Sequence, residues 1–237
     1  MSQTAFAVTA GLIALAMAMA TFDRWLARHR PHELTWTIAF ACFAIASFAL
    51  ALGARHGWNG PLFRTFFLFG AIINVPVLAL GTLQLHDETR ARYYIWTVAL
   101  FCAFSAGVMV TTRFRTPLPI HELARGSVVF DPLPRVLAAV GSGVASLLIV
   151  GGAIRSIIKR HSRQLVMGNA LIALGTLITG ASGLLNSVMG AMDAFAVTLT
   201  LGIAVIFLGF LTATARHRSS NEAVHHRLSK KASPLSA

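Results

Sequence analysis

Residues 62–85 form a strongly apolar stretch that is interrupted by Asn74 and Pro76. Proline has no backbone N–H and clashes with the preceding turn, so a helix here should kink near residue 72. In a bilayer the carbonyls freed by the kink need partners, and Asn74 would lie about 15 Å deeper than Arg64, close to the midplane. The pattern leaves two alternatives, a structural kink and a kink that lines a substrate cavity.

Arg64, Asp193 and Asn186 form a second candidate cluster. Each is expected just inside the external end of a predicted span, so all three would share one depth in the outer leaflet. Charges inside a membrane are costly unless they are paired or hydrated. We expect a salt bridge between Arg64 and Asp193 that clamps the bundle. A ligand or ion vestibule and snorkelling of Arg64 to the head groups are the alternatives.

A third pattern runs through residues 164–188, where small and weakly polar side chains recur at steps of three and four and so share one helix face. Membrane helices associate through close backbone approach and a few hydrogen bonds, which such residues permit. The pattern predicts a helix-packing seam on a helix that lies centrally in the bundle. Its members are Asn169, Ala173, Thr176, Gly180, Gly183 and Ser187, of which Asn169 and Thr176 are also candidates for lining a cavity.

The sequence contains no pattern that predicts catalysis, a metal site or a cofactor. All nine histidines fall in predicted loops or at span ends, whereas a haem held between helices needs axial ligands inside the bundle. No hydrolase, kinase, dinucleotide-binding or metalloprotease motif is present. Cys42 and Cys102 fall in the middle of predicted spans and are expected to be small packing residues. We therefore expect a protein that is not an enzyme.

The composition favours a protein that crosses a membrane several times. Of its 237 residues, 56% are hydrophobic and 12% are charged, whereas soluble domains carry about 25% charged residues. A span needs about 20 apolar residues. The predicted fold is an all-α bundle of seven transmembrane helices in residues 1–215, with spans at about 5–22, 34–54, 62–85, 93–112, 135–155, 165–188 and 191–214.

The positions of the basic residues predict the orientation. If the N-terminus is outside, most of the 20 lysines and arginines lie on the cytoplasmic side, as the positive-inside rule requires. The first apolar segment has no basic residue before it, so it is expected to be a retained helix and no signal peptide. The net charge of +12 then points to anionic lipid head groups at the cytoplasmic face, with no role for nucleic acid.

Two segments lie outside the predicted spans. Residues 113–134 form the longest external loop, and their four prolines favour an ordered but irregular cap over the bundle. Residues 216–237 form a basic cytoplasmic tail whose polar composition predicts disorder. A short repeat, residues 79–83 and again 173–177, joins two spans of opposite direction, as in the inverted repeats of transporters.

The chain also resembles a family of multi-pass membrane proteins of actinobacterial type. The resemblance covers most of the chain and rests on residues 70–81, 134–139, 183–187 and 194–200. It implies a plasma membrane of the Gram-positive kind. The family has no assigned activity, so the resemblance supplies no functional residues.

These patterns favour a non-enzymatic integral protein of the plasma membrane that binds a partner or assists assembly. The partner would be another membrane protein or a second copy of the chain. The alternative is a small-solute transporter or channel with a polar site between the kink at Asn74 and the seam at Thr176. This alternative lacks the acidic or basic residue at mid-depth that ion coupling requires.

Overall fold

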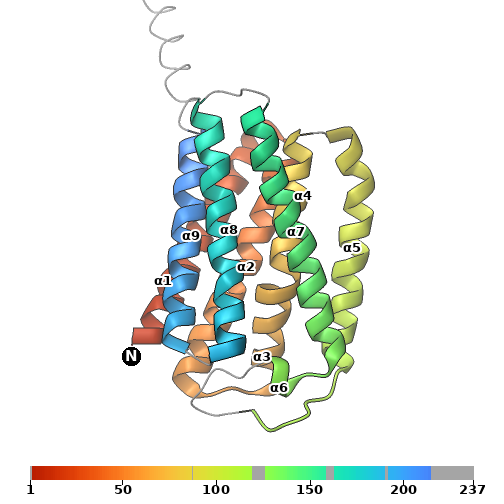
Figure 1. The fold of residues 1–237 in the computed structure, drawn as a ribbon, viewed down its shortest axis with the longest axis vertical. Coiled ribbons are helices and arrows are strands. Elements are labelled where there is room, and N and C mark those ends of the chain that lie inside the picture. Colours follow the sequence, from red (N-terminus) through yellow and green to blue (C-terminus); the bar gives the residue numbers. More distant parts are fainter. Residues whose placement is uncertain (1, 87, 119–125, 159–162, 190–191, 215–237) are drawn as a thin grey trace, which may run out of the picture.

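The computed structural model describes residues 2–86, 88–118, 126–158, 163–189 and 192–214, in which the regular elements are helices (Figure 1). One isolated antiparallel bridge joins Phe114 to Phe130. The helices are α1 (Ser2–Arg28), α2 (Pro31–His56), α3 (Gly60–Phe67), the π-helix η1 (Leu68–Ile73), α4 (Asn74–His86), α5 (Glu88–Thr111), α6 (Gly126–Val129), α7 (Pro132–Ile158), α8 (Arg163–Met189) and α9 (Met192–Thr214).

Six helices in the described residues are long and apolar enough to cross a membrane. They cover Gln3–Arg28, Pro31–His56, Gly60–Leu85, Ala91–Thr111, Pro132–Arg155 and Phe195–Thr212. The apolar stretch described within α8, Val166–Ala181, is shorter. The prediction of an all-helical fold with several long apolar helices is thus confirmed for the described residues, while the number seven and the orientation of the termini stay predictions.

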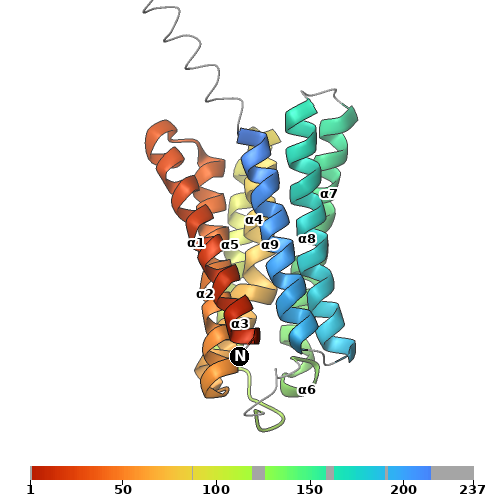
Figure 2. The same ribbon diagram turned by 90° about the vertical axis from the view of Figure 1, so that its left-hand side faces the viewer.

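Most of the long helices close a ring. Neighbouring helices contact one another in the order α1, α2, α4, α7, α8 and α9, and α9 returns to α1 (Figures 1 and 2). Helix α5 lies outside this ring, against α4, η1 and α7. Only 11% of its apolar window is buried, compared with 61% for α2. Of these six spans, α5 therefore buries the smallest share of its surface against the rest of the protein.

Aromatic rings fill the middle of the bundle, where α9 faces α2 and α3. Phe210 of α9 meets Trp36 and Phe40 of α2 edge to face, with centroids 5.8 and 6.1 Å apart. Nearer the other end, Phe66 of α3 meets Phe195 of α9 at 6.2 Å. Each edge-to-face pair adds about 0.5–1.5 kcal/mol of stability beyond the burial of its surface. These rings therefore hold α9 against α2 and α3.

Helices α8 and α9 approach backbone to backbone. A Cβ added at Gly175 would lie 2.7 Å from the carbonyl oxygen of Gly202, and one added at Gly209 would lie 2.7 Å from the carbonyl oxygen of Gly168. At such short distances a side chain does not fit, so both positions require glycine. On the outer side of α8, Leu174 is 50% exposed. Helix α8 therefore lies at the side of the bundle, and the expectation of a central helix does not hold.

The segment between α5 and α7 is ordered in its described parts, residues 113–118 and 126–131. Phe130 is fully buried and stacks on Phe63 of α3, with centroids 5.2 Å apart. The backbone N–H of Arg115 donates to the carbonyl of Val129 at 2.9 Å, and its guanidinium pairs with Asp131. Aromatic packing and these polar contacts anchor the described parts of the segment, which include the single-turn helix α6, and the predicted cap over the bundle stays a prediction.

Candidate functional site

The irregular part of the third span is the π-helix η1, which ends directly before Asn74. Pro76 cannot donate a hydrogen bond to the carbonyl four or five residues earlier, that of Ile72 or Ala71. Across the interface, the Ser142 hydroxyl of α7 donates to the Ala71 carbonyl at 2.7 Å. A neighbouring helix therefore supplies a partner for a carbonyl that the proline cannot satisfy.

Three helices pack closely at this irregularity. A Cβ added at Gly141 of α7 would lie 2.7 Å from Cζ of Phe101 in α5 and 3.4 Å from Cγ of Pro76 in α4. The Asn74 side chain is 8% exposed. Because side chains and backbone fill the space on this side of Pro76, the contacts favour the structural interpretation of the kink.

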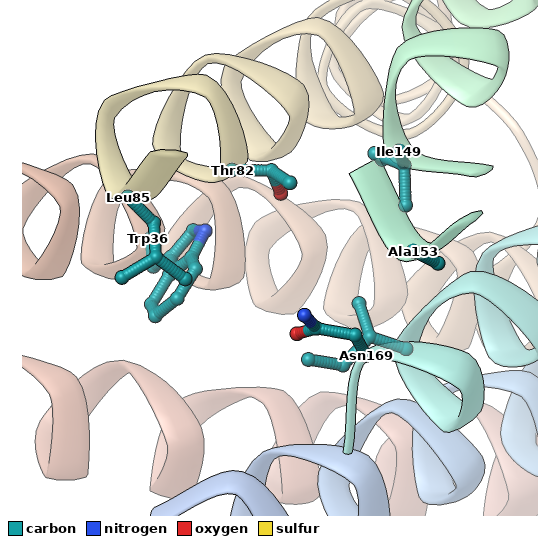
Figure 3. A pocket seen from close by; sticks show the side chains of 7 residues that line it. Trp36, Thr82, Leu85, Ile149, Ala153 and Asn169 are labelled. Carbon is teal, nitrogen blue, oxygen red and sulfur yellow. The ribbon is translucent and has the colours of Figure 1, made fainter. Parts of the chain in front are cut away.

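A small cavity lies further along α4, toward its C-terminal end (Figure 3). Its lining comes from α2, α4, α7 and α8, and consists of Trp36, Thr82, Leu85, Ile149, Ala153, Asn169 and Ile172. Figure 3 shows the amide of Asn169 on the side of the cavity that faces Trp36. The space open to water-sized spheres is about 10 Å³, which is enough for about one water molecule.

This cavity contains only part of the polar site predicted between the third and sixth spans. Asn169 lines it, whereas Asn74 and Thr176 do not. Thr176 is 2% exposed, and its hydroxyl donates to the Ile172 carbonyl of the same helix at 2.8 Å. A hydroxyl bonded to its own helix is satisfied without a ligand.

Arg64 binds the end of α5. Its guanidinium donates to the carbonyls of Met109 and Val110, the latter at 2.8 Å, and lies over the ring of Phe114 at 4.6 Å from the centroid. Carbonyls in the last turn of a helix have no partner in that helix, and they carry the negative end of its dipole. Arg64 thus joins α3 to α5 and to the segment that follows α5.

The predicted partners of Arg64 cannot be placed beside it. Asn186 lies in α8 and Asp193 lies in α9, but their side chains are outside the described residues. The Arg64–Asp193 pair and its completion by Asn186 therefore stay predictions.

The predicted seam of α8 divides into two parts. Asn169, Ala173 and Thr176 point inward, and Ala173 is 7% exposed. Gly180 is exposed, and a Cβ added there would meet nothing within 4 Å. Gly183 and Ser187 belong to the same helix, but nothing beyond their backbone is described. The contact with α9 uses the neighbouring face, with Gly168, Gly175 and Thr179.

Two charged residues at the other end of the bundle could not be recognised as buried from the apolar pattern alone. Glu33 of α2 is 4% exposed, and Arg24 of α1 is partly buried. Both residues had been assigned to a loop, because the predicted first span ended at residue 22 and the second began at residue 34. Pro31 followed by an acidic residue is a helix-start signal, and it could have placed Glu33 in the first turn of α2.

In the described residues, no group of three or more histidine, cysteine, aspartate or glutamate side chains could hold a metal ion. Cys42 is buried and Cys102 partly buried, and neither forms a disulfide. Comparison with protein-family models, with curated proteins and with solved structures finds no match for this chain. The family resemblance and the expectation of a protein without enzymatic activity, metal or cofactor stay predictions.

Proposed function

We propose that this chain is an integral plasma-membrane protein with seven transmembrane helices, which binds a membrane partner through its outer faces and catalyses no reaction. The observation that carries this proposal is the small size of the cavity at the place where α2, α4, α7 and α8 meet. The cavity there has about 10 Å³ of open space, and Asn74 and Thr176 are both buried outside it. A space of this size holds about one water molecule and is too small for a larger solute.

The two ends of the bundle support an outside N-terminus and a cytoplasmic C-terminus. The helices alternate in direction, so the end of α1, the end of α7 and the starts of α2 and α8 share one end (Figure 2). Among the residues that the structure describes, this end carries seven arginines, Arg24, Arg28, Arg30, Arg90, Arg92, Arg155 and Arg163, and the opposite end carries five, Arg55, Arg64, Arg113, Arg115 and Arg135. A cytoplasmic face rich in arginine agrees with the positive-inside rule and with anionic lipids as neighbours.

The outer face of α8 supports a partner that is itself a membrane helix. Gly180 and Ala181 are exposed there, next to the half-exposed Leu177. Small residues on a lipid-facing surface permit another helix to approach closely. The partner would be a different membrane protein or a second copy of this chain.

Substitution of Gly180 by leucine tests this proposal. The side chain would enter open space, so we expect the variant to fold with unchanged stability and to lose most of the complexes seen by cross-linking in native membranes, because leucine prevents the close approach of a second helix. Gly107→Leu is the matched control, because Gly107 is also exposed with nothing within 4 Å, but lies on α5. The proposal fails if both variants keep the wild-type complexes, or if both lose them.

A second candidate function, transport of a small solute, is favoured by one observation. The π-helix, Pro76 and one wall of the small cavity lie along one span, and π-helices occur often at functional sites. This function needs a second state in which water reaches Asn74 and Thr176 from one side of the membrane. A measurement of water access to these two side chains therefore distinguishes transport from partner binding.

A further inference from the structure

Helices α5 and α7 are in contact at one level and separate toward one end of the bundle. A Cβ added at Gly141 of α7 would lie 2.7 Å from Cζ of Phe101 in α5. Figure 1 shows the two helices together at the end near α6 and apart at the end where α5 begins and α7 ends. Beyond the contact between Phe101 and Gly141, each helix therefore turns an uncovered surface toward the other.

The side chains on these uncovered surfaces continue the faces that make the contact. Two helical turns beyond it, Tyr94 lies on the same face of α5 as Phe101, and Leu148 lies on the same face of α7 as Gly141. Tyr94 is 50% exposed and Leu148 is 41% exposed. On the other side of the contact, where the helices stay together, Ser105 of α5 is fully buried. Both helices thus lose protein cover toward the end where α5 begins.

The first turns of α5 have no cover on any side from the part of the chain that the structure describes. Residues 92–97 are all exposed, and six consecutive helical residues point in every direction around the axis at 3.6 residues per turn. The stretch reads Arg-Tyr-Tyr-Ile-Trp-Thr, so most of its exposed surface is apolar or aromatic. Within a membrane such a surface is covered by lipid or by another apolar molecule.

Arg155 supplies a cation at the head-group end of this surface. It lies two further turns along α7 from Leu148, on the same face, and it is exposed. Its guanidinium has no hydrogen bond or ion pair with the residues that the structure describes. Residues 155–163 contain four basic residues and no acidic one. Basic groups between membrane helices at the membrane surface bind the head groups of anionic lipids.

We propose that one anionic phospholipid binds between α5 and α7. Its phosphate accepts hydrogen bonds from Arg155, and one of its acyl chains lies against Leu148, between the two helices. The surface that holds it consists of Tyr94 and Thr97 of α5 and of Val144, Leu148, Gly151 and Arg155 of α7. The lipid takes the place of a protein contact and holds the start of α5 to the bundle, as Arg64 holds its end. The inference requires that the helices lie in a bilayer, and it is independent of the partner surface on α8.

A helix of another protein or of a second copy is the alternative occupant, and the side chains favour lipid. Membrane helices associate through small residues that permit close backbone approach, whereas Tyr93, Tyr94, Ile95 and Trp96 follow one another at the start of α5. A flexible acyl chain can lie between bulky side chains. A phospholipid also places its phosphate at the membrane surface, where Arg155 lies, without any matching residue in a partner.

Quenching by brominated lipids tests the proposal in nanodiscs that hold the full chain. A bimane fluorophore is attached to a single cysteine, Leu148→Cys, in a chain carrying Cys42→Ala and Cys102→Ala. The bilayer is phosphatidylcholine with a fixed fraction of brominated phosphatidylglycerol or, in parallel, of brominated phosphatidylcholine. The charge on Arg155 should raise the relative binding constant for phosphatidylglycerol at position 148 about fivefold, the effect of one basic residue at an anionic membrane surface.

Leu174→Cys on α8 is the matched control position, because Leu174 is 50% exposed and lies at a similar distance from the same end of the bundle. The two brominated lipids should quench equally there. Arg155→Gln should abolish the preference for phosphatidylglycerol at position 148. Arg92→Gln should keep it, because Arg92 is exposed on the face of α5 opposite to Phe101.

The proposal is overturned if position 148 shows no more preference for phosphatidylglycerol than position 174 in the chain with both arginines intact, a result that needs no arginine variant to fold. It is also overturned if the preference survives Arg155→Gln, or if Arg92→Gln abolishes it equally. Quenching of position 148 by neither lipid would show that a protein helix covers the surface, which also overturns the proposal.

Discussion

Replacing Gly202 with leucine is expected to separate α8 from α9 and to destabilise the protein by about 3 kcal/mol, the upper end of the usual cost of overpacking. A Cβ at Gly202 would lie 3.0 Å from the amide nitrogen of Thr179 and 3.1 Å from the carbonyl oxygen of Gly175. Backbone atoms cannot rotate away as the end of a side chain can. The two helices must therefore move apart along their whole contact.

Gly143→Leu in α7 is the matched control, because Gly143 is exposed and a Cβ there would meet nothing within 4 Å. A substitution at such a site changes stability by less than about 0.5 kcal/mol. Unfolding in mixed micelles, followed by circular dichroism as sodium dodecyl sulfate is added, measures both variants. Equal midpoints for the two variants would show that α8 and α9 do not pack as described.

Replacing Arg64 with methionine is expected to release the C-terminal end of α5. The free energy of unfolding should fall by about 3 kcal/mol, if each charged hydrogen bond contributes about 1.5 kcal/mol. Methionine keeps much of the apolar stem and removes the donors to Met109 and Val110. Helix α5 buries little of its surface, so few other contacts would hold it. Hydrogen exchange should then increase in α5 and in residues 112–118.

Arg115→Met is the control for this experiment. Arg115 pairs with Asp131 at the surface, where the two side chains are 54% and 48% exposed. An exposed ion pair contributes about 0–1 kcal/mol. If Arg64→Met costs no more than Arg115→Met, Arg64 does not anchor α5. The same series includes Asp193→Asn, which should be as destabilising as Arg64→Met only if the predicted salt bridge between Arg64 and Asp193 forms.

Features within one segment could be predicted from sequence, because their causes lie in that segment. Apolar length predicted the helices, and Pro76 predicted the disturbance that the structure places at Leu68–Ile73. That the disturbance is a π-helix could not be predicted, since its stability also depends on the hydrogen bond from Ser142 of α7. That donor and its acceptor, Ala71, are 71 residues apart in the sequence.

Features that depend on a second helix were harder to predict. Two faces of α8 carry small residues, and only the position of α9 decides which of them is used. Gly202 and Gly209 are seven residues apart, as are Gly168 and Gly175. This matched spacing on two adjacent helices is a signal that would have indicated the right face.

The charged pair at Arg24 and Glu33 was missed because helix ends are set by capping and not by hydropathy. Helix α1 continues to Arg28, and α2 begins at Pro31. Both charged residues are therefore inside helices. A prediction that ends each helix at its last apolar residue places them in a loop. Charged residues in the middle of an apolar segment stand out in the sequence, whereas buried charged residues near the end of a span do not.

The central claim is that the interior between the third and sixth spans is closed to water, and cysteine accessibility tests it most directly. Single cysteines at Asn74 and Thr176, in a chain carrying Cys42→Ala and Cys102→Ala, would be exposed to a membrane-impermeant thiol reagent from each side. Arg28→Cys, at an exposed helix end, shows that the reagent works. The account predicts labelling at position 28 from one side and none at positions 74 and 176. Labelling of both buried positions from either side would contradict it and would make transport the better account.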